Sequence, residues 1–212
     1  MDSNFKIESK RLLAVEGKDE CNFFKALLKR MNVEGVQIVD IGGKGKFPSE
    51  IRLLNNMDGF GEISTIGFVR DAEMNTAESA FDSVTGVLRK LDLPTPGKPG
   101  EITTTGSPRV SIFIMPDNAG KGMLEDLCLR TIAEERSYAC VDAYIQCFSE
   151  FLPEAKKERF NEPKARVLAY LATRIPVVNS LGLAAQKGFW QLEHESFQDI
   201  RDFLKRLYND SN

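Results

Sequence analysis

The feature that most constrains the fold is a regular alternation of short apolar runs with longer segments of helical periodicity. Four runs rich in apolar and β-branched residues predict buried strands at 12–15, 36–41, 63–69 and 110–115. Apolar side chains recur at helical spacing in the segments that follow them. Strands that alternate with helices form parallel sheets through βαβ units. The sequence therefore predicts an α/β protein with a Rossmann-like, mainly parallel sheet of about four strands flanked by helices.

The last third of the chain has a mostly helical pattern. We expect an α/β domain over 1–135 and a helical C-terminal extension over 136–212 packed on it, although both parts also fit a single domain. Residues 93–109 contain four prolines, several glycines and three consecutive threonines, which predicts a long surface loop or a loose hairpin. Helices are predicted at 19–32, 48–55, 77–91, 123–133, 138–151, 164–174 and 197–208.

Composition excludes some classes of protein. The chain has 212 residues and a net charge of −3, which argues against a generally basic nucleic-acid binder but leaves a local basic groove open. No apolar run approaches the ~20 residues that a membrane span needs, so no membrane partner is expected. The polar N-terminus lacks the apolar core of a signal peptide, which favours a cytoplasmic protein.

The cysteines and the histidine offer little for catalysis. The four cysteines show no CxxC spacing and lie in helical patterns, so we expect free, buried thiols. The single histidine, His194, lies between two glutamates and is expected on a solvated loop. Any chemistry must then come from carboxylates, lysines and a hard metal ion.

Acidic residues follow three of the predicted strands. Glu16 follows the first strand and Glu20 the start of the next helix, Asp71 and Glu73 follow the third strand, and Glu125 follows the fourth. The carboxyl ends of parallel strands share one sheet edge, so these side chains can converge there. Mg²⁺ or Mn²⁺ would offset their mutual repulsion, since both ions prefer oxygen ligands. Asp71 and Glu73 could face one side and hold one ion, while Glu16 could bind a second ion or act as general acid/base.

A glycine-lysine loop follows the second strand. In the segment Gly42–Lys46, the backbone at Gly43 and the side chains of Lys44 and Lys46 suit a phosphate group. The loop lacks the spacing of a Walker A motif. The loop also fits an ordinary solvated turn. In the same way, Glu16-Gly17 fits a plain strand-to-helix turn with the acid at the helix N-terminus. We expect Gly17 to let the chain turn tightly after the strand.

The order of these motifs resembles the Toprim domain, which topoisomerases, bacterial primases, small RNA-maturation nucleases and overcoming-lysogenization-defect (OLD) family nucleases share. The resemblance rests on 12–20, similar to the Toprim glutamate motif, and on 70–73, similar to its paired-aspartate motif. The segments 41–46 and 115–128 also resemble an uncharacterised family of stand-alone Toprim-like proteins related to the OLD-type nucleases. The similarity covers about residues 10 to 130, and it implies a Toprim fold.

The resemblance also implies roles for the acids. Glu16 matches the general acid/base or metal ligand, and Asp71 and Glu73 match the paired metal ligands, with glutamate at 73 in place of the usual aspartate. Glu20 and Glu125 match additional acids of the OLD-like nucleases.

OLD-like nucleases also use a late lysine, for which Lys164 and Lys187 are both candidates. We favour Lys187 as the catalytic lysine, because it follows an apolar run and precedes Gly188, at an expected element end.

Three functions remain open on this evidence. The leading hypothesis is a Mg²⁺- or Mn²⁺-dependent phosphodiester-acting enzyme, a nuclease on DNA or RNA. The alternative is a non-catalytic Toprim-like module that binds a nucleotide, a nucleic acid or a protein partner. A phosphotransfer enzyme for a small nucleotide is the third. The helical C-terminal part could supply a lid or the face of a homodimer.

Overall fold

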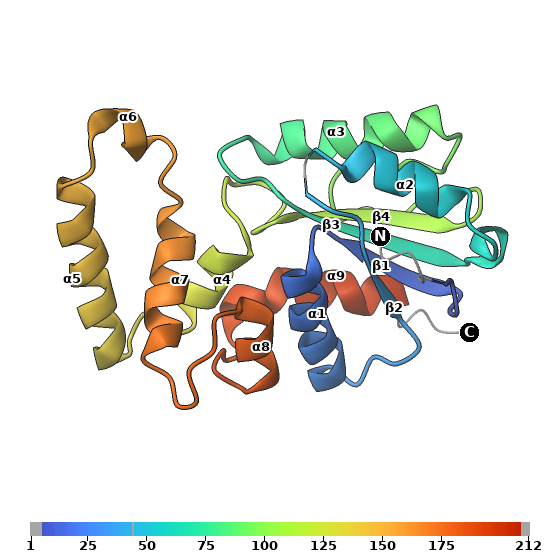
Figure 1. Ribbon diagram of the computed structural model, residues 1–212. Coiled ribbons are helices and arrows are strands. Elements are labelled where there is room, and N and C mark those ends of the chain that lie inside the picture. The colour runs from blue at the N-terminus through green and yellow to red at the C-terminus, as the bar shows by residue number, and fades with distance from the viewer. Residues whose placement is uncertain (1–5, 44, 209–212) are drawn as a thin grey trace.

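A four-stranded parallel sheet forms the centre of the molecule (Figure 1). The computed structural model describes residues 6–43 and 45–208. In the sheet, the strands lie in the order β2-β1-β3-β4. The α/β fold and all four predicted strands are therefore confirmed. The strands are β1 (Arg11–Val15), β2 (Gln37–Asp40), β3 (Thr65–Asp71) and β4 (Arg109–Met115).

Helices cover both faces of this sheet. α2 and α3 lie on one face, and α1 and α9 lie on the other (Figure 1). The predicted helices are present with small shifts at their ends, whereas the short helices α6 and α8 were not predicted. The helices are α1 (Lys18–Arg30), α2 (Phe47–Asn55), α3 (Ala77–Lys90), α4 (Leu124–Arg130), α5 (Arg136–Glu150), α6 (Glu154–Lys157), α7 (Glu162–Ala172), α8 (Leu181–Gln186) and α9 (Gln198–Tyr208), with 3₁₀ turns η1 (Phe60–Glu62) and η2 (Glu195–Phe197). None of the helices in the described ranges is long and apolar enough to cross a membrane.

Each strand contributes side chains to two hydrophobic layers. In β1, Leu12 and Ala14 belong to the cluster under α2 and α3, whereas Leu13 and Val15 belong to the cluster under α1 and α9. Successive side chains of a strand point to opposite faces, so a strand covered on both sides reads as a continuous apolar run. This is why the strands were visible in the sequence.

The last helix packs very closely on the sheet. A Cβ added at Gly67 of β3 would lie 2.7 Å from Leu207 Cδ2 and 2.9 Å from the Tyr208 hydroxyl. The buried Tyr208 hydroxyl donates a hydrogen bond to the carbonyl of Leu12 in β1. One hydrophobic cluster contains strand residues together with residues of α5, α7, α8 and α9. The boundary near residue 135 therefore stays a prediction.

The proline-rich segment from 93 to 108 runs irregularly along β4. Gly100 N–H donates to the Ile112 carbonyl at 2.7 Å, and Thr103 N–H donates to the Val110 carbonyl at 2.9 Å. The Ser111 hydroxyl donates to the Glu101 carbonyl at 2.7 Å. These bonds lie on the side of β4 away from β3. The long loop expected from the sequence is present, and it covers the edge of the sheet.

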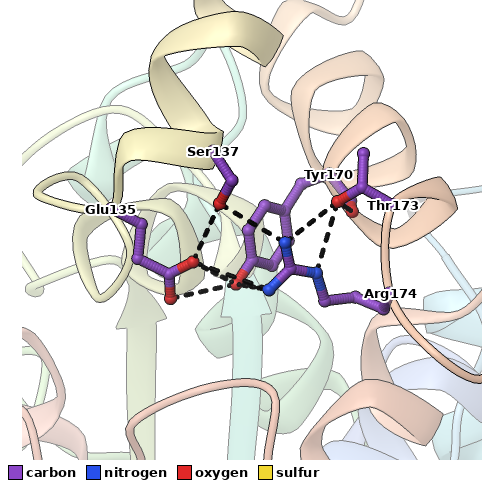
Figure 2. Close-up of polar contacts among 5 residues, drawn as sticks. All are labelled: Glu135, Ser137, Tyr170, Thr173 and Arg174. Carbon is purple, nitrogen blue, oxygen red and sulfur yellow. Dashed lines mark hydrogen bonds and ion pairs between the residues drawn. The ribbon is translucent and has the colours of Figure 1, made fainter.

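Helices α5, α6 and α7 project from the sheet as an arm, defined here as residues 136–172 (Figure 1). A polar network joins the two ends of the arm at its base (Figure 2). The Tyr170 hydroxyl donates to the Glu135 carboxylate at 3.0 Å, and Arg174 Nη2 donates to the Ser137 hydroxyl at 3.3 Å. The Arg174 guanidinium stacks over the Tyr170 ring, 4.2 Å from its centroid. The network fixes where the arm leaves the body.

The cysteines do not all lie where the sequence placed them. Cys128 is buried and Cys21 is half-buried, but Cys140 and Cys147 are exposed on α5. The prediction of four buried thiols is therefore wrong for these two. A helical pattern does not show which face of an outer helix is covered.

Candidate functional site

The acidic residues gather where the sheet reverses its winding direction. From β1 the chain moves to β2 on one side and then returns to β3 on the other side. Glu16 directly follows β1, and Asp71 is the last residue of β3, its neighbour. Ligands of open α/β sheets bind outside the carboxyl ends of strands at such a switch point. The topology thus brings Glu16 and Asp71 to the expected edge.

Glu16 is a largely buried carboxylate with one cationic partner. Arg70 Nε lies 3.3 Å from Glu16 Oε1, and the Glu16 side chain is 15% exposed. Burial raises the Glu16 pKa to about 7, against the opposing effects of the Arg70 charge and the backbone N–H of Asp71. Repulsion from Glu73 and Glu20 adds to the rise. The carboxyl group therefore titrates near neutral pH, as a general acid/base requires.

Arg70 is the cationic partner of Glu16, and the sequence interpretation left it without a role. Its side chain is buried, and its Nη1 donates to the Ser83 hydroxyl at 3.0 Å. Its guanidinium lies 4.9 Å from the centroid of the Phe47 ring in α2. The available signal was a charged residue at the end of an apolar strand pattern, which requires a partner when buried. Arg70 holds Glu16 against the α2 and α3 side of the sheet.

Asp71 lies on the other side of the strand and faces different acids. Burial raises its pKa well above the ordinary value, and repulsion from Glu16, Glu125 and Glu20 raises it further. The N–H of Leu124 donates to Asp71 Oδ1 at 3.2 Å. Because strand side chains alternate, Arg70 and Asp71 point to opposite faces. Glu16 and Asp71 are therefore neighbours that approach the sheet edge from its two sides.

Glu20 and Glu125 complete the group on the Asp71 side. Burial raises both pKa values. Repulsion from Asp19 and Asp40 adds to the rise for Glu20, and repulsion from Glu20 and Asp19 adds to the rise for Glu125. Lys164 of the arm opposes this rise in both, and its Nζ lies 3.9 Å from Glu125 Oε1. Glu125 belongs to the first turn of α4 and is buried. The chain thus brings four carboxylates together, with Arg70 and Lys164 beside them.

Glu73 lies beyond the end of β3, the strand that carries Asp71. The strand ends at Asp71, and Glu73 has a φ of +54°, which turns the backbone out of the strand direction. Its backbone exchanges two hydrogen bonds with Gly122, at 2.8 and 2.9 Å. Alternation along a strand therefore does not set Asp71 and Glu73 on one side, as the sequence interpretation assumed. The electrostatic effect of Glu73 is on Glu16.

Gly17 has a different role from the expected one. Its φ of −167° is ordinary extended backbone, so the turn after β1 does not depend on a glycine conformation. A Cβ at this position would lie 2.8 Å from Glu20 Oε2. The glycine provides room for the Glu20 carboxylate.

Glu16, Glu20 and Asp71 line one small pocket together with Arg70. Its volume is about 10 Å³, which is room for a single water molecule or ion. The donors fit Mg²⁺ or Mn²⁺ in kind, because they are carboxylates that repel one another. Within 6–43 and 45–208, however, no three acidic, histidine or cysteine side chains are arranged so that they could hold a metal ion. The carboxylates are therefore of the kind that binds Mg²⁺ or Mn²⁺, but in this structure they are not arranged as a coordination shell for the ion.

The glycine-lysine loop is placed at the end of β2. Gly43 and Lys46 are exposed, and Lys44 lies outside the described residues. The N–H groups of Lys46 and Phe47 donate to the Gly43 carbonyl at 2.8 and 3.1 Å. These two amides are engaged within the loop, so a phosphate contact would depend on other groups.

The two candidate lysines are in different places. Lys164 lies beside Glu125, whereas Lys187 is exposed at the C-terminal end of α8 and enters no ion pair in the part of the chain described. The arm therefore brings Lys164, rather than Lys187, to the acids.

Asp19 has a structural role that its sequence position did not reveal. Its carboxylate accepts hydrogen bonds from the Ser180 hydroxyl, from Leu181 N–H at 3.0 Å and from Gly182 N–H at 2.6 Å. These groups form the N-terminus of α8. Asp19 thus attaches α8 to α1.

Comparisons with solved structures return proteins of low sequence identity. The C-terminal region of the Xanthomonas campestris pv. campestris OLD protein is 11% identical, covers 96% of this chain and 98% of its own, and has a TM-score of 0.48. A hypothetical protein from Pyrococcus horikoshii OT3 is 17% identical, covers 93% of this chain and 94% of its own, and has a TM-score of 0.48. No curated protein matches the chain.

One family model matches almost the whole chain. It spans residues 10–209, which includes every strand and helix described above. The chain therefore belongs to the family described as "Protein of unknown function (DUF3226)".

Proposed function

We propose that this chain is a Mg²⁺- or Mn²⁺-dependent phosphodiester-acting enzyme of the Toprim type, a nuclease on DNA or RNA. The observation that carries the proposal is the pocket lined by Glu16, Glu20 and Asp71 at the switch point of the sheet. Acids in a pocket whose pKa values are raised by burial and by one another are candidates for a functional site. The motif order that resembles the Toprim domain points to the same edge.

The residues of the chain have distinct roles in this proposal. Glu16, with its pKa raised to about 7, takes or gives a proton near neutral pH, and Arg70 positions it. Asp71, Glu20 and Glu125 supply oxygen ligands. A bound divalent cation would activate water and stabilise the leaving oxygen.

Other residues would meet the phosphate or tune the acids. In this proposal, Lys164 contacts a phosphate beside Glu125; its ammonium group is exposed and lies 3.9 Å from Glu125 Oε1, which supports this role. Burial is the main cause of the raised Glu16 pKa, and repulsion from Glu73 adds to it. Gly43, Lys46 and Lys187 remain candidates for phosphate contacts farther from the acids. The cytoplasm, with its free Mg²⁺ and nucleic acid, is the proposed location.

The test is a strand-cleavage assay on labelled single- and double-stranded DNA and RNA. We expect cleavage with Mg²⁺ or Mn²⁺, none with EDTA, and a loss of about 100-fold or more in Glu16→Gln, as removal of a general acid/base gives. Glu158→Gln is the matched control, because Glu158 is exposed at the end of α6. Absence of cleavage under every metal condition, or full activity of Glu16→Gln, would contradict the mechanism.

A second candidate function is a non-catalytic module that binds a nucleotide, a nucleic acid or a protein. It is favoured by the Arg70–Glu16 ion pair, which neutralises Glu16 without any metal. Isothermal titration with Mg²⁺, nucleotides and short oligonucleotides separates the two candidates. Binding of an oligonucleotide without turnover, unaffected by Glu16→Gln, would support the module and exclude the enzyme.

A further inference from the structure

The outer face of α5 carries an apolar stripe that no described part of the chain covers. Cys140, Ala143, Tyr144, Cys147 and Phe151 are all exposed, and Tyr144 and Phe151 are 62% and 79% exposed. Each of these positions has another member of the group three or four residues away, so they share one helical face. The opposite face buries Val141 and Ile145 in the core. α5 is the outermost helix of the molecule, with α7 between it and the body (Figure 1).

The charges of α5 have an order that is unfavourable for an isolated helix. Arg136 begins the helix and Glu150 ends it, although a helix dipole favours acids at the start and bases at the end. Both are exposed, and neither forms an ion pair with another residue described by the structure. Asp142, the third charged residue of α5, is half-buried and paired with Arg166 at 3.0 Å. An antiparallel copy of α5 would bring each unpaired charge opposite its complement.

We propose that α5 is the interface of a homodimer in which the α5 helices of two copies pack antiparallel. In the proposed dimer, the two-fold axis passes between positions 143 and 144 of the two helices. Cys140 then faces Cys147 of the second copy, and Tyr144 lies over the small Ala143 of the second copy. Arg136 reaches the end of α5 in the second copy, where its guanidinium lies over the Phe151 ring and forms an ion pair with Glu150. The same stripe serves both copies, as an isologous interface requires.

The arm presents this face on a rigid support. Arg166 of α7 bonds Asp142 of α5, and Tyr170, Arg174, Glu135 and Ser137 join the ends of the arm at its base (Figure 2). A helix of 15 residues is about 22 Å long, so one pair of α5 helices makes a small interface. We therefore expect a dimer that dissociates on dilution. It does not depend on the proposed nuclease activity.

The first test is sedimentation analysis of the full chain under reducing conditions, over a range of concentrations. The mass of the wild type should rise toward twice that of the monomer, whereas Ala143→Arg should remain a monomer, because it places two like charges at the axis. Leu53→Arg is the control, since it adds the same charge at a 50% exposed position of α2. Circular dichroism should show that both variants keep the wild-type helix content and melting temperature.

The second test is cross-linking by diamide, which takes two electrons and two protons for each disulfide formed. An antiparallel dimer links Cys140 only to Cys147 of the second copy. The distance along the axis between the two copies of Cys140 would be about 10 Å, which exceeds the reach of a disulfide. Neither Cys140→Ser nor Cys147→Ser should therefore cross-link alone. An equimolar mixture of the two variants should give a dimer with one disulfide.

The outcomes separate the possible arrangements. A wild type that stays monomeric at all concentrations would overturn the proposal. Cross-linking of either single variant alone, beyond the background of the Cys140→Ser/Cys147→Ser double variant, would indicate a parallel or unrelated contact and would also overturn it. Dimerisation of Ala143→Arg would have the same meaning. Loss of nuclease activity would bear on the proposed function alone.

Discussion

At the scale of single residues, Glu16 is subject to two opposing effects. Burial favours its neutral form, whereas the Arg70 guanidinium favours its charged form, and burial is the larger effect. If the Arg70 charge outweighed burial, the Glu16 pKa would be low. Because its pKa is raised instead, keeping Glu16 charged in the folded state costs free energy at pH values where it is ionised.

This raised pKa predicts how stability depends on pH. The ordinary value is 4.5 and the value in the folded chain is about 7, so the folded state binds the proton more tightly. The contribution of protonated Glu16 to the free energy of unfolding is fully present below pH 4.5 and is lost as the pH rises through 7. The loss is on the order of 3 kcal/mol. In EDTA, the free energy of unfolding should fall from pH 5 to pH 8 in wild type and should fall less in Glu16→Gln. Urea denaturation at the two pH values measures this.

The raised pKa of Asp71 also makes the free energy of unfolding fall as the pH rises. The Glu16→Gln variant should therefore keep part of the decline seen in wild type. Glu158→Gln, at an exposed position, should decline as the wild type does. An equal decline in Glu16→Gln and wild type would show that Glu16 has no raised pKa.

At the scale of elements, α8 depends on a residue far away in the sequence. It has six residues, too few for a helix that is stable in isolation. Asp19 accepts hydrogen bonds from its first turn, and an added Cβ at Gly182 would lie 2.2 Å from the Asp19 carbonyl oxygen. The contact between α1 and α8 therefore requires both Asp19 and a glycine.

Removal of the Asp19 carboxylate should release α8. We expect Asp19→Ala to lower the free energy of unfolding by about 2 kcal/mol, because donors at the start of α8 lose their acceptor. Hydrogen exchange should increase at 181–186 and stay unchanged in α3. Asp82→Ala, on the exposed side of α3, is the control. Unchanged protection of α8 in Asp19→Ala would contradict the capping role.

The elements also show what the sequence could predict and why. Apolar periodicity located all four strands and most helices, because buried faces repeat every two or 3.6 residues. α8 was missed because it has only six residues and because Asp19, which accepts hydrogen bonds from its first turn, is more than 160 positions away. The strand ends located Glu16 and Asp71 through topology. Arg70 was given no role, and Lys164 could not be separated from Lys187, because the contacts of Arg70 with Glu16 and of Lys164 with Glu125 arise only in three dimensions.

At the scale of the whole molecule, the first strand and the last helix meet at the sheet. Tyr208 of α9 bonds Leu12 of β1, and Leu207 fills the space above Gly67. The hydrophobic cluster that includes Leu207 and Tyr208 extends through α1, α4, α5, α7 and α8. One face of the sheet is therefore completed only by the last helix.

This arrangement predicts a single cooperative unfolding transition. We expect calorimetry of the full chain to show one transition with equal calorimetric and van't Hoff enthalpies. A fragment of residues 1–135 should show no cooperative transition, because it lacks α9 over the sheet. The control is a chain of residues 1–208, which keeps every described element. Two transitions in the full chain, or a folded 1–135 fragment, would instead support two domains.

The segment along β4 has a consequence for how the molecule can associate. Exposed strand edges are templates on which other chains can add a strand. Here the carbonyls of Val110 and Ile112 already accept bonds from Thr103 and Gly100 of the same chain. A foreign strand would have to break this internal pairing before it could bind at β4. The proline-rich segment from 93 to 108 thus protects the β4 edge from intermolecular strand addition and from the aggregation that can follow.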